Sequence, residues 1–138
     1  MPDTRTAQIN MSDGGVVIVR IRNNARQSVP DAHENLAAAV SETAGRRRPL
    51  LVDVRNAQPL AADVRQQYTG PTVVNAFTAL ALLVEASPMG TMMGNVYLRV
   101  ARLGIPTKLF TSEPEAMQWL DERRADADRS EPGLSVDR

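Results

Sequence analysis

The chain has 138 residues, of which 43% are hydrophobic and 23% are charged. This balance is typical of one globular domain of ordinary size and excludes a disordered or membrane-embedded chain. There is no cysteine and a single histidine, His33, which excludes disulfides, thiolate metal sites, a cysteine nucleophile and a metal site built from several histidines of one chain.

The 16 basic and 16 acidic residues cancel, and no feature of the sequence predicts a nucleic-acid partner. Aromatic residues make up 4% of the chain, and the one compact basic run, Arg46–Arg48, is short, whereas nucleic-acid surfaces combine larger basic patches with aromatic platforms. The basic run follows Gly45 at a predicted helix end, where cations complement the helix dipole. Contact of this run with anionic lipid, or with the acidic residues 121–128 of another subunit, is the alternative.

No segment has the ~20 consecutive apolar residues that a membrane-spanning helix requires, and the first ten residues lack the apolar core of a signal peptide. We therefore expect a bacterial cytoplasmic protein without stable membrane insertion.

Residues 4–22 predict an antiparallel hairpin. The apolar residues of 7–11 alternate with polar ones, Val16–Ile21 is a run rich in β-branched residues, and Ser12–Gly15 provides turn residues that tolerate positive φ.

A helix is predicted to begin at Pro30, because Asp31 and Glu34 have the spacing of a capping box, and to end before Gly45. The apolar run at 50–54 then predicts a strand buried on both faces.

The rest of the chain alternates between helix and strand. We expect a helix at 60–69, a helical turn or irregular chain at 72–77, a strand at 79–84, a helix at 88–103, a strand at 107–111 and a helix from Ser112 to Arg124. Residues 125–138 are predicted to form a disordered acidic tail after a single domain of residues 1–124. The order β-β-α-β-α-β-α-β-α predicts an α/β fold with a mixed, mainly parallel sheet and helices packed on it.

The second half of the chain carries five short motifs in order: ALLV at 81–84 with Ser87-Pro88, GNVYLR at 94–99, PTKLFT at 106–111 and AMQWL at 116–120. Together with the element order they resemble an uncharacterised bacterial family of small SpoIIAA-like domains, also described as STAS/SEC14-like. The resemblance covers about residues 5–122. It implies the STAS scaffold of the sporulation anti-sigma-factor antagonists and of sulfate-transporter tails, acting through binding.

In the antagonists that this chain resembles, a serine at the start of the helix after the central strand is phosphorylated, which breaks docking onto a kinase. If Asp53 corresponds to the aspartate that closes that strand, the matching residues here are 59–63, which contain no serine or threonine. The resemblance therefore implies the scaffold without the phosphorylation switch. Asp63 has two interpretations: a permanent charge on this surface, or an acid that only complements the helix dipole.

The segment 88–103 is the candidate interaction surface. An apolar stripe runs along it, Leu98 lies off the stripe, and Gly90 and Gly94 leave a groove that packing on the sheet, a dimer contact or a ligand could fill. Our hypothesis is a self-association or partner surface made by Met93, Tyr97, Leu98, Arg99 and Arg102.

Two alternatives stay open. The first is a SEC14-like lipid or small-molecule carrier, with a pocket lined by Phe77, Met89, Met92, Met93 and Phe110 and with Arg99 or Arg102 at a head group, although 138 residues leave little room for such a cavity. The second is an enzyme that uses Asp53 and Glu85 near the carboxyl ends of parallel strands for acid/base work or Mg²⁺ binding. The simpler interpretation is that these acids cap loop amides or pair with arginines such as Arg55, and that His33 is a solvated helix residue. We therefore expect a non-catalytic regulatory module without a cofactor, which binds itself and a regulatory protein.

Overall fold

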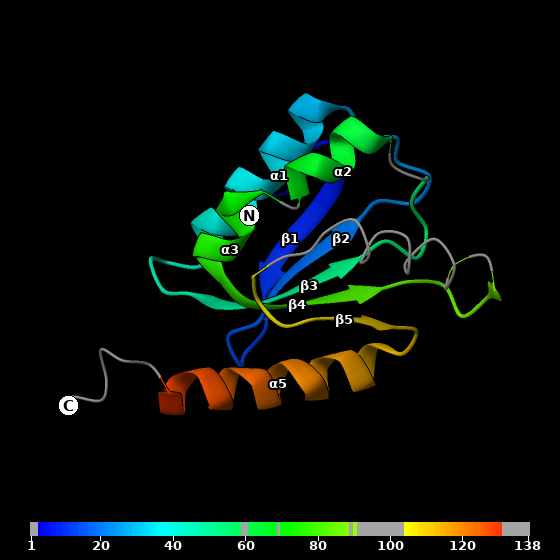
Figure 1. Ribbon diagram of the computed structural model, residues 1–138. Coiled ribbons are helices and arrows are strands. Elements are labelled where there is room, and N and C mark those ends of the chain that lie inside the picture. The colour runs from blue at the N-terminus through cyan, green and yellow to red at the C-terminus, as the bar shows by residue number, and fades with distance from the viewer. Residues whose placement is uncertain (1–2, 59–60, 69, 89, 91–103, 131–138) are drawn as a thin grey trace.

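The computed structural model describes residues 3–58, 61–68, 70–88, 90 and 104–130. Five strands form one sheet in the order β1-β2-β3-β4-β5 (Figure 1). The strands are β1 (Ala7–Met11), β2 (Val17–Ile21), β3 (Arg48–Asp53), β4 (Phe77–Leu83) and β5 (Thr107–Phe110). β1 and β2 pair antiparallel, as a hairpin must, and the other three pairings are parallel.

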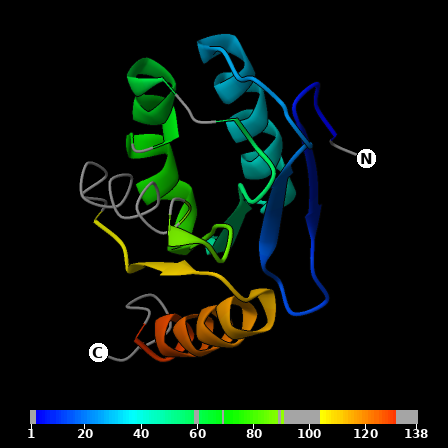
Figure 2. The same ribbon diagram turned by 90° about the vertical axis from the view of Figure 1, so that its right-hand side faces the viewer.

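Helices cover both faces of this sheet (Figures 1 and 2). On one face lie α1 (Val29–Glu42), α2 (Ala62–Tyr68) and α3 (Pro71–Ala76), and on the other lies α5 (Glu113–Ser130). The predicted α/β class with a mixed, mainly parallel sheet is confirmed. The predicted helix over 88–103 falls almost entirely outside the described residues, and none of the described helices combines the length and apolar character that crossing a bilayer requires.

The two faces bury separate hydrophobic cores. The core on the α1 face draws mainly on β1, β2, α1 and Phe77, and includes Ala7, Ile9, Val17, Val19, Ile21, Leu36, Ala39, Leu50, Val73 and Phe77. The core on the α5 face draws on β2, β3, β4, β5 and α5, and includes Ile18, Leu51, Ala79, Ala81, Leu83, Phe110, Ala116 and Leu120. Because inward residues alternate along each strand, one sheet serves both cores.

An irregularity at the start of β4 decides which core Phe77 joins. Arg48 pairs with Phe77 but Pro49 pairs with Ala79, so Thr78 is an extra residue on β4. Pro49 has no N–H for the ladder, and the extra residue turns Phe77 away from the face that Ala79 occupies. Phe77 and Phe110 therefore lie on opposite faces of the sheet, and the prediction that they line one lipid pocket is wrong.

The start of α1 differs from the predicted capping box. Ser28 is the N-cap: its Oγ accepts from the Asp31 N–H at 3.4 Å, and the Asp31 carboxylate accepts from the Ser28 N–H at 2.9 Å. The box is thus Ser28 with Asp31, one turn earlier than the predicted Asp31 with Glu34. Pro30 falls within the first helical turn, where its missing N–H costs no intrahelical hydrogen bond.

The far end of the fold also differs from the prediction. α5 continues to Ser130 rather than ending near Arg124, so residues 125–130 do not begin the predicted disordered tail. The sequence has no proline or glycine between Glu115 and Glu131, and nothing in it stops the helix at Arg124. Residues 131–138 lie outside the described residues.

Candidate functional site

The predicted interaction surface cannot be placed on this fold. Met93, Tyr97, Leu98, Arg99 and Arg102 lie outside the described residues, as do Met89 and Met92 of the predicted lipid pocket. The described candidates are the polar groups at the strand ends and on α1 and α2.

Asp53, the last residue of β3, is 8% exposed and surrounded by donors. It accepts hydrogen bonds from the Arg55 backbone N–H at 3.1 Å and from the Arg55 Nε and Nη2 at 3.0 and 2.8 Å. Arg20 of β2 adds a bond from Nη1 at 2.9 Å. The interpretation that Asp53 caps a loop amide and pairs with Arg55 is confirmed.

Glu113, in the first turn of α5, completes a group of four that we name the carboxyl-edge network: Arg20, Asp53, Arg55 and Glu113. Arg20 Nη1 and Nη2 donate to the two oxygens of Glu113 at 2.9 and 2.7 Å, and Arg55 Nη2 donates to Glu113 at 3.2 Å. Two guanidinium groups thus balance two carboxylates at the edge of the sheet where open α/β folds place ligands.

Both acids of the network are held in the ionised form. Hydrogen bonding from Arg20, and then the charges of both arginines, lowers the pKa of Glu113 despite partial burial. Burial alone would raise the pKa of Asp53, but the bonds from Arg55, supported by Arg20, outweigh burial and lower it. General acid/base catalysis near neutral pH is most efficient with a carboxyl pKa close to 7, and the arginines shift the pKa of both acids in the opposite direction.

Glu85, the second acid of the predicted catalytic pair, is exposed after β4 and takes no part in the carboxyl-edge network. Among the residues that the structure describes, no group of three or more histidine, aspartate or glutamate side chains could hold a metal ion.

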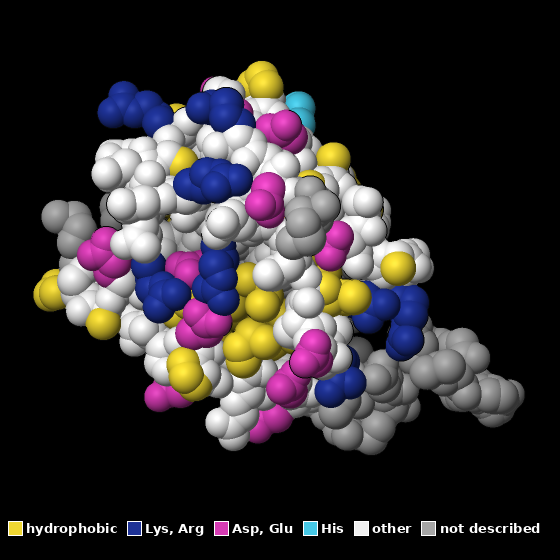
Figure 3. Space-filling model, turned by 180° about the vertical axis from the view of Figure 1, so that it is seen from behind, with side chains coloured by type: hydrophobic (Ala, Val, Ile, Leu, Met, Phe, Trp, Pro, Cys, Tyr) yellow, Lys and Arg dark blue, Asp and Glu magenta, His cyan; other side chains and the backbone are white. Residues whose placement is uncertain are grey.

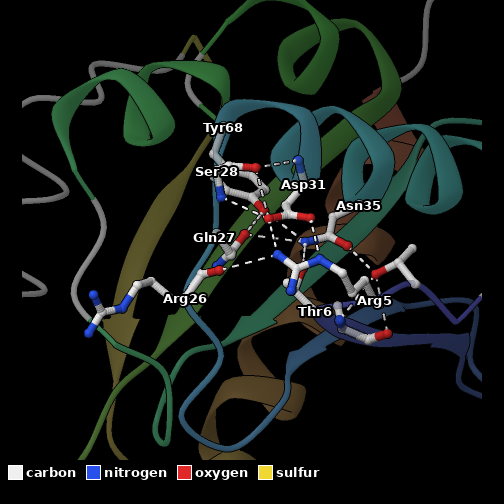
Figure 4. Close-up of polar contacts among 10 residues, drawn as sticks. Arg5, Thr6, Arg26, Gln27, Ser28, Asp31, Asn35 and Tyr68 are labelled. Carbon is white, nitrogen blue, oxygen red and sulfur yellow. Dashed lines mark hydrogen bonds and ion pairs between the residues drawn. The ribbon is translucent and has the colours of Figure 1, made fainter.

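A second polar group, the α1 polar cluster, lies where β1, the start of α1 and the end of α2 meet (Figure 4). Its centre is Asn35, which is 1% exposed. Asn35 Nδ2 lies within hydrogen-bond distance of Thr6 Oγ1 at 2.9 Å, Tyr68 OH at 3.1 Å and Gln27 Oε1 at 3.2 Å. The sequence analysis did not single out Asn35, although it lies between Ala32 and Ala39 on the helix face that packs on the sheet.

Ionised groups close the exposed side of this cluster. Arg5 Nε donates to Asp31 at 3.0 Å, and Arg5 Nη2 donates to its other oxygen. Bonding from Arg5, with the Ser28 N–H, lowers the pKa of Asp31 to about 2. Burial raises the pKa of Tyr68 to about 12. The neutral Tyr68 hydroxyl, which also donates to Gln27, thereby attaches the end of α2 to α1.

α2 occupies the region that the resemblance matched to the antagonists' phosphorylated helix start. Asp63 is exposed in its first turn, and its Oδ1 accepts from the Val64 N–H at 2.9 Å. His33 Nε2 lies 2.6 Å from Gln67 Oε1 of α2, and both groups are on the surface. The expectation that His33 is a solvated helix residue is confirmed.

The basic run behaves in part as predicted. Arg48 Nε donates to Thr43 O, at the C-cap of α1, at 2.9 Å. Arg47 Nη2 donates to Val74 O and Phe77 O, at the end of α3, at 2.9 and 2.6 Å. Both bonds place a cation at a helix C-terminus. The face in Figure 3 shows acidic and basic side chains interspersed rather than one broad basic surface.

Comparisons with known proteins agree on the fold. The chain aligns with an uncharacterised Shewanella loihica protein of the DUF3478 family, which has a SpoIIAA-like fold, at 15% identity over 83% of this chain and 91% of that one, with a TM-score of 0.57. It aligns with an anti-sigma factor antagonist from Mycobacterium paratuberculosis at 16% identity over 87% and 97% of the two chains, with a TM-score of 0.52. No curated protein matches the sequence.

At these identities the two structures show the fold alone, and they confirm the SpoIIAA-like resemblance. The sequence itself matches a family model over residues 9–124, described as a domain of unknown function, DUF7793. That match spans most of the chain, and the protein therefore belongs to the DUF7793 family and has a SpoIIAA-like fold.

Proposed function

We propose that this domain is a non-catalytic regulatory module that acts in the cytoplasm by binding a protein partner. The observation that carries the proposal is the carboxyl-edge network. It occupies the edge of the sheet where an α/β enzyme would place its substrate, and every carboxylate in it is paired with arginine. The fold shared with an anti-sigma factor antagonist supports a partner of the regulatory kind.

The partner surface that we propose is the outer face of α2. Val64 of this short helix is buried, while Ala61, Ala62 and Asp63 are exposed at its start. Tyr68 is bonded to Asn35 and Gln27 at the other end, so the surface is presented in one orientation. With Asp63 in place of a phosphorylatable residue, its charge is permanent and phosphorylation does not switch it.

Affinity capture from the native cell extract tests this surface. The bait proteins are the wild type, Asp63→Arg on α2 and Glu122→Arg, a matched charge reversal at an exposed position of α5. We expect wild type and Glu122→Arg to retain the same protein and Asp63→Arg to lose it. Capture of one set of proteins by all three baits, with circular dichroism confirming their folding, would contradict the α2 surface.

We also propose that the chain self-associates through Met93, Tyr97, Leu98, Arg99 and Arg102, on the strength of the sequence pattern. Sedimentation of the wild type and of Leu98→Asp decides this point. An oligomer that Leu98→Asp converts to a monomer supports it, and monomers in both samples contradict it.

A further inference from the structure

A pocket of about 320 Å³ opens between the end of α1 and α3. Its walls are Val40, Thr43, Gly45, Arg46, Arg47, Thr72, Asn75 and Ala76. These residues precede β3 and β4 in the chain, so the pocket lies at the amino-terminal edge of the sheet, opposite the carboxyl-edge network. The volume is at the lower end of the range for small-molecule sites.

The pocket lining is positively charged. It includes two arginines, two hydroxyl groups and an amide, and no aspartate or glutamate. Arg46 is exposed, and its guanidinium makes no hydrogen bond or ion pair with the described residues. The bonds of Arg47 to Val74 and Phe77 use Nη2, which leaves its Nε and Nη1 without a partner in the described part of the chain.

Helix capping accounts for the neighbouring arginines but not for Arg46. The carbonyl of Thr43 at the end of α1 already accepts from Arg48 Nε and from the Arg46 backbone N–H. The end of α3 is capped by Arg47. Among the described residues, the Arg46 side chain bonds to no helix carbonyl, although it lines a pocket beside a second, partly engaged guanidinium.

We propose that this pocket binds a small phosphate monoester. The phosphate oxygens would accept hydrogen bonds from Arg46 and Arg47, because a planar guanidinium matches the geometry of an oxyanion better than a lysine ammonium does. The Thr72 hydroxyl and the Asn75 amide would be further donors. Val40 and Ala76 give the wall an apolar part for a compact organic group. The ligand would join the end of α1 to α3. This site lies outside the α2 surface of the proposed function and does not depend on it.

Calorimetric titration at low salt, with phenyl phosphate and inorganic phosphate as probes, tests the site. Arg46→Gln removes the cation that has no partner in the described part of the chain, and Thr72→Val removes one donor at nearly constant shape. Arg26→Gln is the matched control, because Arg26 is exposed on another loop and its side chain makes no hydrogen bond with the described residues.

We expect saturable binding of phenyl phosphate to the wild type and to Arg26→Gln with the same Kd. Arg46→Gln should raise the Kd roughly tenfold and Thr72→Val should raise it a few-fold, because charge-assisted bonds are the stronger ones. Inorganic phosphate should bind more weakly than phenyl phosphate. Shifts in the backbone amide resonances of Thr72 and Asn75 would place the probe in the pocket.

Absence of saturable binding to the wild type would overturn the proposal. Equal weakening by Arg46→Gln and Arg26→Gln would also overturn it, because it would assign the binding to net charge. Equal affinity for the two probes would overturn the apolar contact with Val40 and Ala76.

Discussion

Arg20 of β2 and Glu113 of α5 are 93 positions apart in the sequence and form a bidentate ion pair, with N···O distances of 2.9 and 2.7 Å. Asp53 shares Arg20 with Glu113, and Arg55 reaches both acids. The first turn of α5 is thereby attached to the carboxyl ends of β2 and β3, where partial burial strengthens each pair relative to a surface ion pair.

Replacing Glu113 with glutamine should loosen this attachment. Glu113→Gln leaves Arg20 with one carboxylate instead of two, and we expect the free energy of unfolding to fall by about 1 kcal/mol, since the pair is one-third exposed. Urea unfolding measures the change. Glu115→Gln, an exposed acid in the same turn, is the control and should change stability by less than about 0.5 kcal/mol. Equal values for the two variants would contradict a stabilising role for the network.

Stability should fall in acid as Asp31 takes up a proton. Bonds from Arg5 and Ser28 lower the pKa of Asp31 to about 2, from an ordinary value of 3.8. A carboxyl whose folded-state pKa is lowered stabilises the fold fully above its unfolded pKa and loses that contribution as the pH falls through the folded value. We therefore expect Asp31 to contribute to a loss of stability between about pH 4 and pH 2.

Urea unfolding of the wild type and Asp31→Asn over that pH range checks this expectation. Asp31→Asn should be less stable at pH 7 and should show a shallower dependence on pH below 4. Asp13→Asn, in the exposed hairpin turn, serves as the control with the wild-type slope. An Asp31→Asn profile parallel to that of the wild type would contradict the assignment.

Tyr68 should titrate far above a free tyrosine. Burial raises its pKa to about 12 from 10, so its neutral form stabilises the fold below pH 10 and this contribution is lost as the pH rises toward 12. Phenolate absorbance in a Tyr97→Phe background isolates Tyr68, because the chain has only two tyrosines. A midpoint near 10 in the folded protein would contradict its burial in the α1 polar cluster.

Removing the Tyr68 hydroxyl tests the attachment of α2 to α1. Tyr68→Phe keeps the ring but loses the bonds with Asn35 and Gln27, and we expect the free energy of unfolding to fall by about 1 kcal/mol. We also expect faster amide exchange in α2 of this variant. If neither the free energy of unfolding nor the exchange rate changed, the hydroxyl would not hold the helix.

The hairpin turn between β1 and β2 should require glycine at only one of its two glycine positions. Gly15 has a φ of 90°, and a Cβ there would lie 3.1 Å from Arg48 Nη1. Gly14 does not have a positive φ, and its Cβ would meet only ordinary contacts at 3.6 Å or more. Gly15→Ala should therefore cost about 1–2 kcal/mol, and Gly14→Ala should be close to neutral. Thermal unfolding of the two variants compares them, and a more costly Gly14→Ala would refute this account of the turn.

The sequence by itself determined the element order and the α/β class. Alternation in β1, the run at 50–54 and the periodicity of α1 and α5 are local patterns, and each described strand and helix begins within a few residues of its predicted start. The end of α5, at Ser130 rather than near Arg124, was not predicted. The capping box of α1 was assigned wrongly, because Ser28 and Asp31 are both residues that favour an N-cap. In the structure Ser28 is the N-cap and Asp31 is its partner.

Only the tertiary structure decided which polar residues meet. The pairing of Arg20 with Glu113 requires α5 to pack on β3 and β4. The burial of Asn35 requires contacts from Thr6, which immediately precedes β1, and from Tyr68 of α2. An extra residue opposite Pro49 placed Phe77 and Phe110 on opposite faces, against an expectation based on residue type alone. Contacts of this kind depend on sheet register and helix packing, which bring together residues far apart in the chain and leave no local pattern in the sequence.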